Sequence, residues 1–193
     1  TLRTGDGVGL VGSSLLAKSL IMQIFQGQSR VDAGAIWIVA GDSWLNLAQL
    51  SRSQLQSMCH TTLGYLGQVL PTSLRATAFE MVMDPLIERD TPRPAAREMA
   101  SRLLTQLNVP RRLWRVSPSQ FSKAEQQRVN IARTFAVDYP VYLLNAPMTH
   151  LAERDRAPLI ELIEQRKASG SAFVGLFQDR ELQMRTCTST LSC

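Results

Sequence analysis

Residues 141–144 limit the possible folds of this chain more than any other segment. The four side chains from Val141 to Leu144 are all apolar, and Pro140 and Pro147 bound the run. A strand with no polar face has to be buried on both sides, which is typical of strands inside a parallel sheet. We therefore predict an α/β domain with a mainly parallel sheet.

Short apolar segments alternate with segments of helical periodicity along the rest of the chain. The expected strands are residues 8–11, 36–39, 63–66, 141–144 and 172–177, and the expected helices are residues 15–25, 76–83, 95–107, 124–135 and 159–167. We expect Gly41-Asp42-Ser43 to form a turn and Pro85 to lie beyond the end of a helix. The pattern predicts one domain over residues 1–193, with a helical subdomain at about residues 72–135 and a frayed tail at residues 186–193.

The composition is that of a soluble globular protein, with 45% hydrophobic and 19% charged residues. No apolar run approaches the roughly 20 residues that span a bilayer. The amino end lacks the basic and apolar regions of a signal peptide. We expect a cytoplasmic protein without a membrane span.

The net charge of +5 comes from scattered arginines, with one cluster at Arg111, Arg112 and Arg115. No nucleic-acid motif accompanies them, so solvated helix faces are favoured over a nucleic-acid partner. Cys59 and Cys187 form no C-x-x-C pair with each other or with the third cysteine. The cysteine pattern therefore predicts neither a disulfide framework nor a zinc site.

Residues 12–19 follow the frame of a phosphate-binding loop, G-x-x-x-x-G-K-[ST], between a strand and a helix. In such a loop, backbone N–H groups surround the phosphates, the lysine reaches the outer phosphates and the hydroxyl binds Mg²⁺. Ala17 replaces the second glycine, and Leu15 adds a side chain inside the loop. The candidate nucleotide-binding residues are Gly12, Ser13, Ser14, Lys18 and Ser19.

Two interpretations of the end of this loop remain open. Lys18 and Ser19 could bind an isolated anion at a helix N-terminus, which needs no catalysis. They could equally be a surface lysine and a serine that caps the helix.

Four further elements follow in a set order. Along the chain, Gln68 follows an apolar strand and comes first, residues 121–128, FSKAEQQR, and residues 141–147, VYLLNAP, come next, and Gln178 follows another apolar strand and comes last. In this order they resemble the Q-loop, signature helix, Walker B strand and switch region of the ABC-type ATPases. The signature-like residues are Ser122, Lys123, Ala124 and Glu125.

The resemblance implies an ABC-type P-loop domain with a helical subdomain, built to bind ATP and Mg²⁺ in a dimer. It assigns Gln68 to the nucleotide site, beside Ser19, as a second metal ligand. ABC domains also carry antiparallel strands and an adenine-stacking aromatic residue upstream of the loop. Only 11 residues precede Gly12, so we expect these strands to be missing or truncated.

A narrower resemblance rests on residues 103–114, LLTQLNVPRRLW, and on residues 82–86, 118–122 and 137–140. These segments resemble the L component of the phosphonate carbon–phosphorus lyase system. That family implies a cytoplasmic complex of several protein subunits, in which a different subunit breaks the C–P bond.

The chain departs from the ABC pattern at its catalytic positions. Asn145 replaces the Walker B aspartate, Ala146 replaces the glutamate that acts as base, and Gln178 replaces the switch histidine. Asn145 lacks the charged carboxylate that helps to hold Mg²⁺, and the methyl group of Ala146 cannot accept a proton from the attacking water. Lys123 and Ala124 likewise replace the signature glycines, so we expect no catalytic residues, and ATP and Mg²⁺ bound weakly or not at all.

The leading hypothesis is a degenerate ABC subunit that acts as a scaffold in a phosphonate-metabolism complex. The alternatives are an active ATPase completed by a partner chain, the ATPase component of an ABC transporter, and a decaying duplicate.

Overall fold

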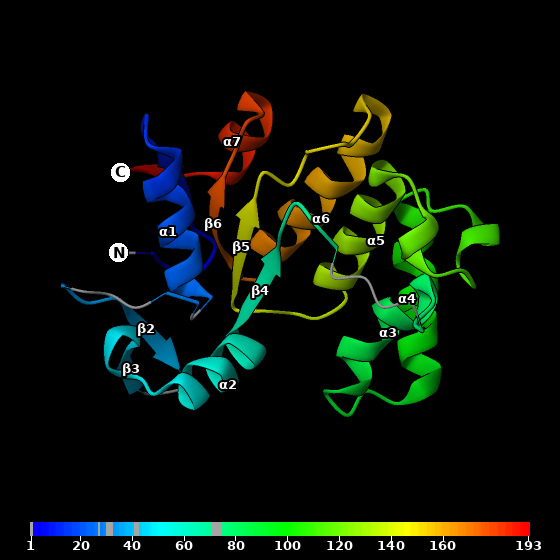
Figure 1. Cartoon of the computed structure of the whole chain (residues 1–193), viewed down its shortest axis with the longest axis horizontal. Helices are drawn as coiled ribbons and strands as arrows, with labels where there is room; N and C mark the ends of the chain where they lie inside the picture. The colour runs from blue at the N-terminus through cyan, green and yellow to red at the C-terminus, as the bar shows by residue number, and fades with distance from the viewer. Residues whose placement is uncertain (1, 27, 30–32, 41–42, 71–74) are drawn as a thin grey trace.

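The computed structural model of this chain describes residues 2–26, 28–29, 33–40, 43–70 and 75–193. Its main strands are β1 (Gly7–Val11), β4 (Leu63–Leu66), β5 (Val141–Asn145), β6 (Ala172–Leu176) and β7 (Ser189–Ser192). They form one sheet in the order β4-β5-β6-β1-β7, and every neighbouring pair is parallel. Figure 1 shows β4, β5 and β6 side by side. The parallel sheet confirms the predicted α/β class.

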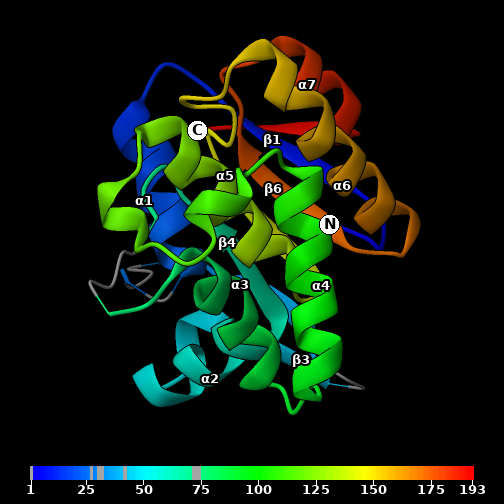
Figure 2. The ribbon, with the colours of Figure 1, turned by 90° about the vertical axis from the view of Figure 1, so that its right-hand side faces the viewer.

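Seven α-helices are described around this sheet. They are α1 (Leu15–Phe25), α2 (Arg52–Thr62), α3 (Ala78–Ile87), α4 (Arg93–Gln106), α5 (Lys123–Phe135), α6 (Arg156–Ala168) and α7 (Arg180–Thr186). Figure 2 shows α1 on one side of the sheet and α6 and α7 on the other. None of the described helices is long and apolar enough to cross a membrane.

Successive residues of β5 point into two different cores, as the period of a strand requires. Tyr142 and Leu144 belong to the core under α5 and α6, whereas Leu143 belongs to the core under α1. In the first core the ring of Tyr142 stacks between Phe135 and Phe173, with centroids 4.9 and 5.1 Å away. All three β5 residues are fully buried, so the apolar run 141–144 is explained by helices on both faces.

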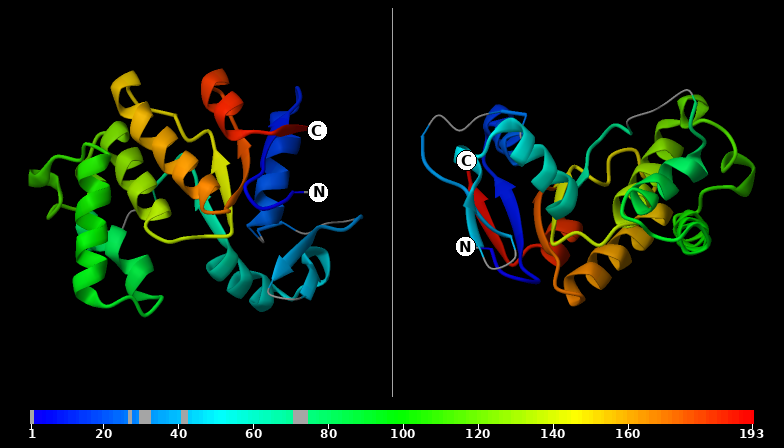
Figure 3. Two further views of the ribbon diagram at one scale, coloured as in Figure 1. Left: turned by 180° about the vertical axis from the view of Figure 1, so that it is seen from behind. Right: turned by 90° about the horizontal axis from the view of Figure 1, so that it is seen from below.

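A second, smaller sheet consists of β2 (Trp37–Ala40) and β3 (Ser43–Asn46), which pair antiparallel. It lies with α2 at one end of the molecule, whereas α3, α4 and α5 gather at the other end (Figure 3). The expected strand 36–39 corresponds to β2, shifted by one residue. Of the expected turn, Gly41 and Asp42 lie outside the described residues, and Ser43 already belongs to β3.

The prediction that a helix ends before Pro85 is wrong, because α3 continues to Ile87. Proline removes one helical hydrogen bond and disfavours a helix interior by about 3 kcal/mol. A capping box between Thr77 and Glu80 secures the start of α3, and Pro85 and Leu86 are buried near its end. Packing on the neighbouring helices therefore outweighs the missing hydrogen bond.

The predicted frayed tail is also wrong. Asp179 caps α7 by accepting a hydrogen bond from the Leu182 amide at 2.9 Å, and β7 then joins the edge of the sheet beside β1. All residues of β7 are exposed. An exposed edge strand is held through backbone hydrogen bonds, so its side chains show no apolar alternation that would reveal it in the sequence.

Candidate nucleotide site

The candidate site residues lie at the carboxyl ends of parallel strands. β1 ends one residue before Gly12, β5 ends at Asn145, and β4 and β6 each end two residues before a glutamine, Gln68 and Gln178. Parallel strands bring their carboxyl ends to one edge of the sheet, where open α/β sheets bind ligands. The topology thus places the four motif ends at a common edge.

The loop after β1 is shorter than the sequence motif suggests, because α1 already begins at Leu15. Ser14 is the N-cap of α1, and its hydroxyl accepts a hydrogen bond from the Ala17 amide at 3.1 Å. The Lys18 ammonium donates to the Gly12 carbonyl at 2.9 Å. A phosphate-binding loop directs its backbone amides and its lysine at the ligand. Here the Ala17 amide and the Lys18 ammonium instead form hydrogen bonds within the chain.

Gly12 is required by its conformation and by its neighbour. Its φ of +134° lies in a region that side chains rarely adopt, and a Cβ there would stand 2.0 Å from the carbonyl oxygen of Cys193. The Cys193 amide also donates to the Val11 carbonyl at 2.9 Å. The segment after β7 therefore lies directly against the start of the candidate loop.

The end of β5 carries no charge. The Asn145 side-chain amide donates to the hydroxyl of Tyr65, on β4, at 3.3 Å. Ala146 is buried at φ +47°, and its amide donates to the Leu176 carbonyl at 2.9 Å. A non-glycine residue in this left-handed region costs about 1–2 kcal/mol, so the chain keeps a strained backbone here without a carboxylate.

The signature-like residues form the first turn of α5. Ser122 and Glu125 make a reciprocal capping box: the Ser122 hydroxyl and amide donate to the Glu125 carboxylate at 2.7 and 2.9 Å. These hydrogen bonds hold the pKa of Glu125 below its usual value. Lys123 is exposed. The Ser122 hydroxyl is thus engaged in a hydrogen bond within the helix end.

Gln68 and Gln178 are both exposed. The chain is anchored beside Gln68 by α5, because the side chain of Asn130 donates to the Gly67 carbonyl at 2.9 Å and Thr134 donates to the Tyr65 carbonyl at 3.3 Å. Sequence reasoning missed these contacts. Their signal was polar side chains on the buried face of a helix.

Sequence reasoning also missed a buried ion pair. Arg128 of α5 contacts Asp155 at 3.3 Å, with side chains 11% and 4% exposed. Gln127, one residue earlier, donates to the Pro147 carbonyl at 2.9 Å. Together they tie α5 to the segment that follows β5.

The parallel strand order and the loop between β1 and α1 are those of an α/β domain with a ligand edge. The model of the ABC transporter family matches residues 1–149, which is most of the chain. The chain therefore belongs to the ABC transporter family.

Similar proteins include the lipoprotein-releasing system ATP-binding protein LolD of Pseudomonas fluorescens, 29% identical over 182 residues that cover 94% of this chain and 78% of LolD. LolD 1 of Rhodopseudomonas palustris is 30% identical over 188 residues, 96% of this chain and 80% of that protein. The macrolide export ATP-binding/permease protein MacB of Hyphomonas neptunium is 28% identical over 185 residues, but this chain spans only 28% of its length.

Among solved structures, the dimeric bacterial ABC transporter cassette MJ0796 superposes with a TM-score of 0.84 and 23% identity, covering 100% of this chain and 83% of that one. At this identity the match establishes the fold.

These relatives overturn the narrower resemblance to the carbon–phosphorus lyase L component, since they are cassettes of lipoprotein release and macrolide export. The structure explains the error. Leu103, Leu104, Leu107 and Val109 of the resembling segment are core residues. Core packing selects such a pattern in cassettes of any function.

Proposed function

We propose that this chain is the ATP-binding-cassette component of an ABC transporter, and that its own site binds MgATP weakly or not at all and hydrolyses little. Membership of the ABC transporter family supports the first part, as do relatives named as ATP-binding proteins. We propose a second cassette and a membrane permease as its partner proteins. Because ATP is a cytoplasmic metabolite, we place the chain on the cytoplasmic side of the membrane.

The end of β5 is the observation that carries the proposal of weak hydrolysis. Asn145 and Ala146 stand where the ABC pattern has two carboxylates, and the Asn145 amide is directed at Tyr65. Neither side chain can take a proton from water. Phosphoryl transfer depends on positioned charges, and this chain supplies none at the end of β5.

The loop before α1 supports weak nucleotide binding. A phosphate entering it would have to replace the hydrogen bonds from Lys18 to the Gly12 carbonyl and from the Ala17 amide to Ser14. The loop therefore does not fit a nucleotide as an open phosphate-binding loop would. A single anion at the start of α1 remains compatible with Lys18 and Ser19.

The Mg²⁺ ligands implied by the family do not fit well either. Ser19, Gln68 and Asn145 offer neutral oxygens only, whereas protein sites for Mg²⁺ use carboxylates in addition to phosphate oxygens. Within the described part of the chain, no three acidic, histidine or cysteine side chains gather closely enough to hold a metal. No step of a reaction is therefore assigned to a metal.

An active ATPase completed by a partner chain is the second candidate. Its support is that Gly12, Lys18 and Ser19 keep the motif frame, and that a similar cassette forms dimers. A partner can contribute a signature segment to this chain's loop. It cannot replace Ala146, which lies on this chain's own strand end.

The test is steady-state ATP hydrolysis by the purified chain, alone and with its partner proteins. We expect turnover far below about 1 s⁻¹, the lower end of common enzyme rates. The variant Asn145→Asp/Ala146→Glu should raise the rate, and the matched neutral variant Asn145→Gln/Ala146→Gln should not. Turnover near 1 s⁻¹ in the wild-type chain would contradict the proposal.

Nucleotide binding separates the two candidates further. Fluorescent ATP is titrated into the wild type and Lys18→Ala, with and without Mg²⁺. Tight, Mg²⁺-dependent binding that Lys18→Ala abolishes favours the active ATPase. Weak binding with little dependence on Lys18 favours the degenerate cassette.

A further inference from the structure

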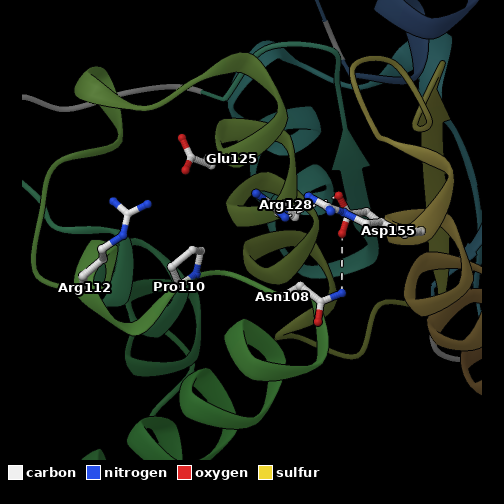
Figure 4. Close-up of a pocket in the computed structure, with 7 residues that line it drawn as sticks. Asn108, Pro110, Arg112, Glu125, Arg128 and Asp155 are labelled. Carbon is white, nitrogen blue, oxygen red and sulfur yellow. Dashed lines mark hydrogen bonds and ion pairs between the residues drawn. The ribbon is translucent and has the colours of Figure 1, made fainter.

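A pocket of about 520 Å³ lies between the segment after α4, the first turns of α5 and η4 (Glu153–Asp155) (Figure 4). Pocket volumes of this size are typical of small-molecule sites. Ser122, Lys123 and Ala124 do not line it. The pocket therefore shares only Glu125 with the signature-like turn, and six of its seven lining residues are polar or charged.

The wall of the pocket includes a buried guanidinium, that of Arg128. Arg128 is 9% exposed and pairs with Asp155, which also accepts a hydrogen bond from Asn108 at 3.4 Å. The Nε atom of Arg128 is buried without a hydrogen-bond partner. The ion pair with Asp155 holds the Arg128 guanidinium in place at this wall.

Two more arginines line the pocket, Arg112 and Arg154, and both are exposed. Neither forms an ion pair with any residue that the structure describes. Asp155 pairs with Arg128, and Glu125 accepts hydrogen bonds from Ser122, which together with the charges of Arg128 and Arg112 lower its pKa. Three guanidinium groups against two carboxylates leave a net charge of +1 on the lining.

We propose that this pocket binds the phosphate group of a small phosphorylated molecule. Guanidinium groups match the geometry of phosphate oxygens and bind them through paired hydrogen bonds. The volume exceeds what a phosphate group alone fills, which leaves space for an organic part beside Pro110. The proposal does not depend on nucleotide at the loop before α1.

The test is calorimetric titration of the full chain with inorganic phosphate and with glycerol 3-phosphate, at constant ionic strength. We expect saturable binding, and a dissociation constant about tenfold or more higher in Arg112→Gln/Arg154→Gln, because hydrogen bonds to charged groups are lost. Both side chains are exposed, so the variant should fold, and an unchanged melting temperature checks this. The matched control is Arg115→Gln, an exposed arginine of the same cluster outside the pocket, which should change the constant less than about twofold.

The variant Lys18→Ala separates this pocket from the start of α1 and should leave the affinity unchanged. Tighter binding of glycerol 3-phosphate than of phosphate supports an ester ligand, and equal binding supports recognition through the phosphate group alone. Absence of saturable binding overturns the proposal. So does binding that Lys18→Ala abolishes and Arg112→Gln/Arg154→Gln leaves intact.

Discussion

The helices on the two faces of the central sheet are attached in different ways. On one face, α5 is joined to its surroundings by side chains that are themselves buried, including Arg128, Asn130 and Phe135. On the other face, α1 buries Met22 but leaves Leu16 82% and Leu20 46% exposed. The hydrogen bonds at its start, from Lys18 and to Ser14, lie at the surface.

This difference indicates that α5 contributes more buried contacts to the fold than α1 does. On the α5 face, buried polar contacts join α5 to Asp155, in the segment after β5, and to Gly67, in the segment after β4. At the end of β5, Asn145 and Ala146 carry no charge, and the Ala146 amide still donates a hydrogen bond to the Leu176 carbonyl. Variants on the α5 face should therefore affect stability, and matched variants on the α1 face should not.

Arg128→Ala is expected to have the largest effect. Removing one partner of a buried pair leaves Asp155 as an uncompensated charge, which costs about 3–5 kcal/mol. The free energy of unfolding in urea measures this loss. Arg185→Ala breaks the exposed ion pairs with Glu164 and Glu181 and should cost about 1 kcal/mol or less, because exposed pairs contribute little. Equal losses in the two variants would show that the buried pair has no special role.

Leu104→Ala compares packing on the two faces. Leu104 is fully buried in the core of α4 and α5, and truncation of such a leucine costs about 2–5 kcal/mol. Leu16→Ala makes the same change on α1, where the side chain is 82% exposed, and should shift stability by less than about 0.5 kcal/mol. A large loss in Leu16→Ala would contradict the proposed difference between the faces.

The two helix caps offer a smaller contrast. Ser122→Ala removes a full capping box from α5, and Ser14→Ala removes one hydrogen bond from α1. Loss of an N-cap costs about 1 kcal/mol, and we expect the larger loss at Ser122.

The pH dependence tests the α5 cap separately. The pKa of Glu125 is lowered in the folded state, so its contribution is present above the ordinary value of 4.5 and is lost as pH falls through the lower folded pKa. Ser122→Ala should therefore lose less stability on acidification than the wild type does. An identical acid profile in the variant would remove Ser122 as the cause of the shift.

The sequence predicts the buried parts of the fold and few of the exposed parts. The run 141–144 indicates a strand covered on both faces, and helix periodicity locates α1 to the residue. The edge strand β7 has no apolar pattern to reveal it, and Pro85 is overridden by packing that no local rule contains. The ordered motifs indicate the ABC family, whereas the leucines of α4 misled the narrower assignment because any tightly packed core favours them.

The candidate site is less predictable because it depends on partners in space. Motif positions can be assigned to Gly12, Lys18 and Asn145 from the sequence. The hydrogen bonds from Lys18 to Gly12 and from Asn145 to Tyr65 cannot be predicted from motif spacing. The Asn145–Tyr65 contact joins residues 80 positions apart. Arg128 aligns with a motif arginine, yet its pairing with Asp155 follows only from the fold.

Lys18→Ala should have the smallest effect on stability, below about 0.5 kcal/mol, because its hydrogen bond to the Gly12 carbonyl is exposed to water. In a loop shaped around nucleotide, the same change would abolish binding while leaving the apo fold intact. Urea unfolding of wild type and variant, without and with ATP, measures both quantities. If ATP stabilises the wild type by several kcal/mol and not the variant, the loop opens to receive nucleotide, and the hydrogen bonds from Lys18 and to Ser14 describe a closed state rather than a lost site.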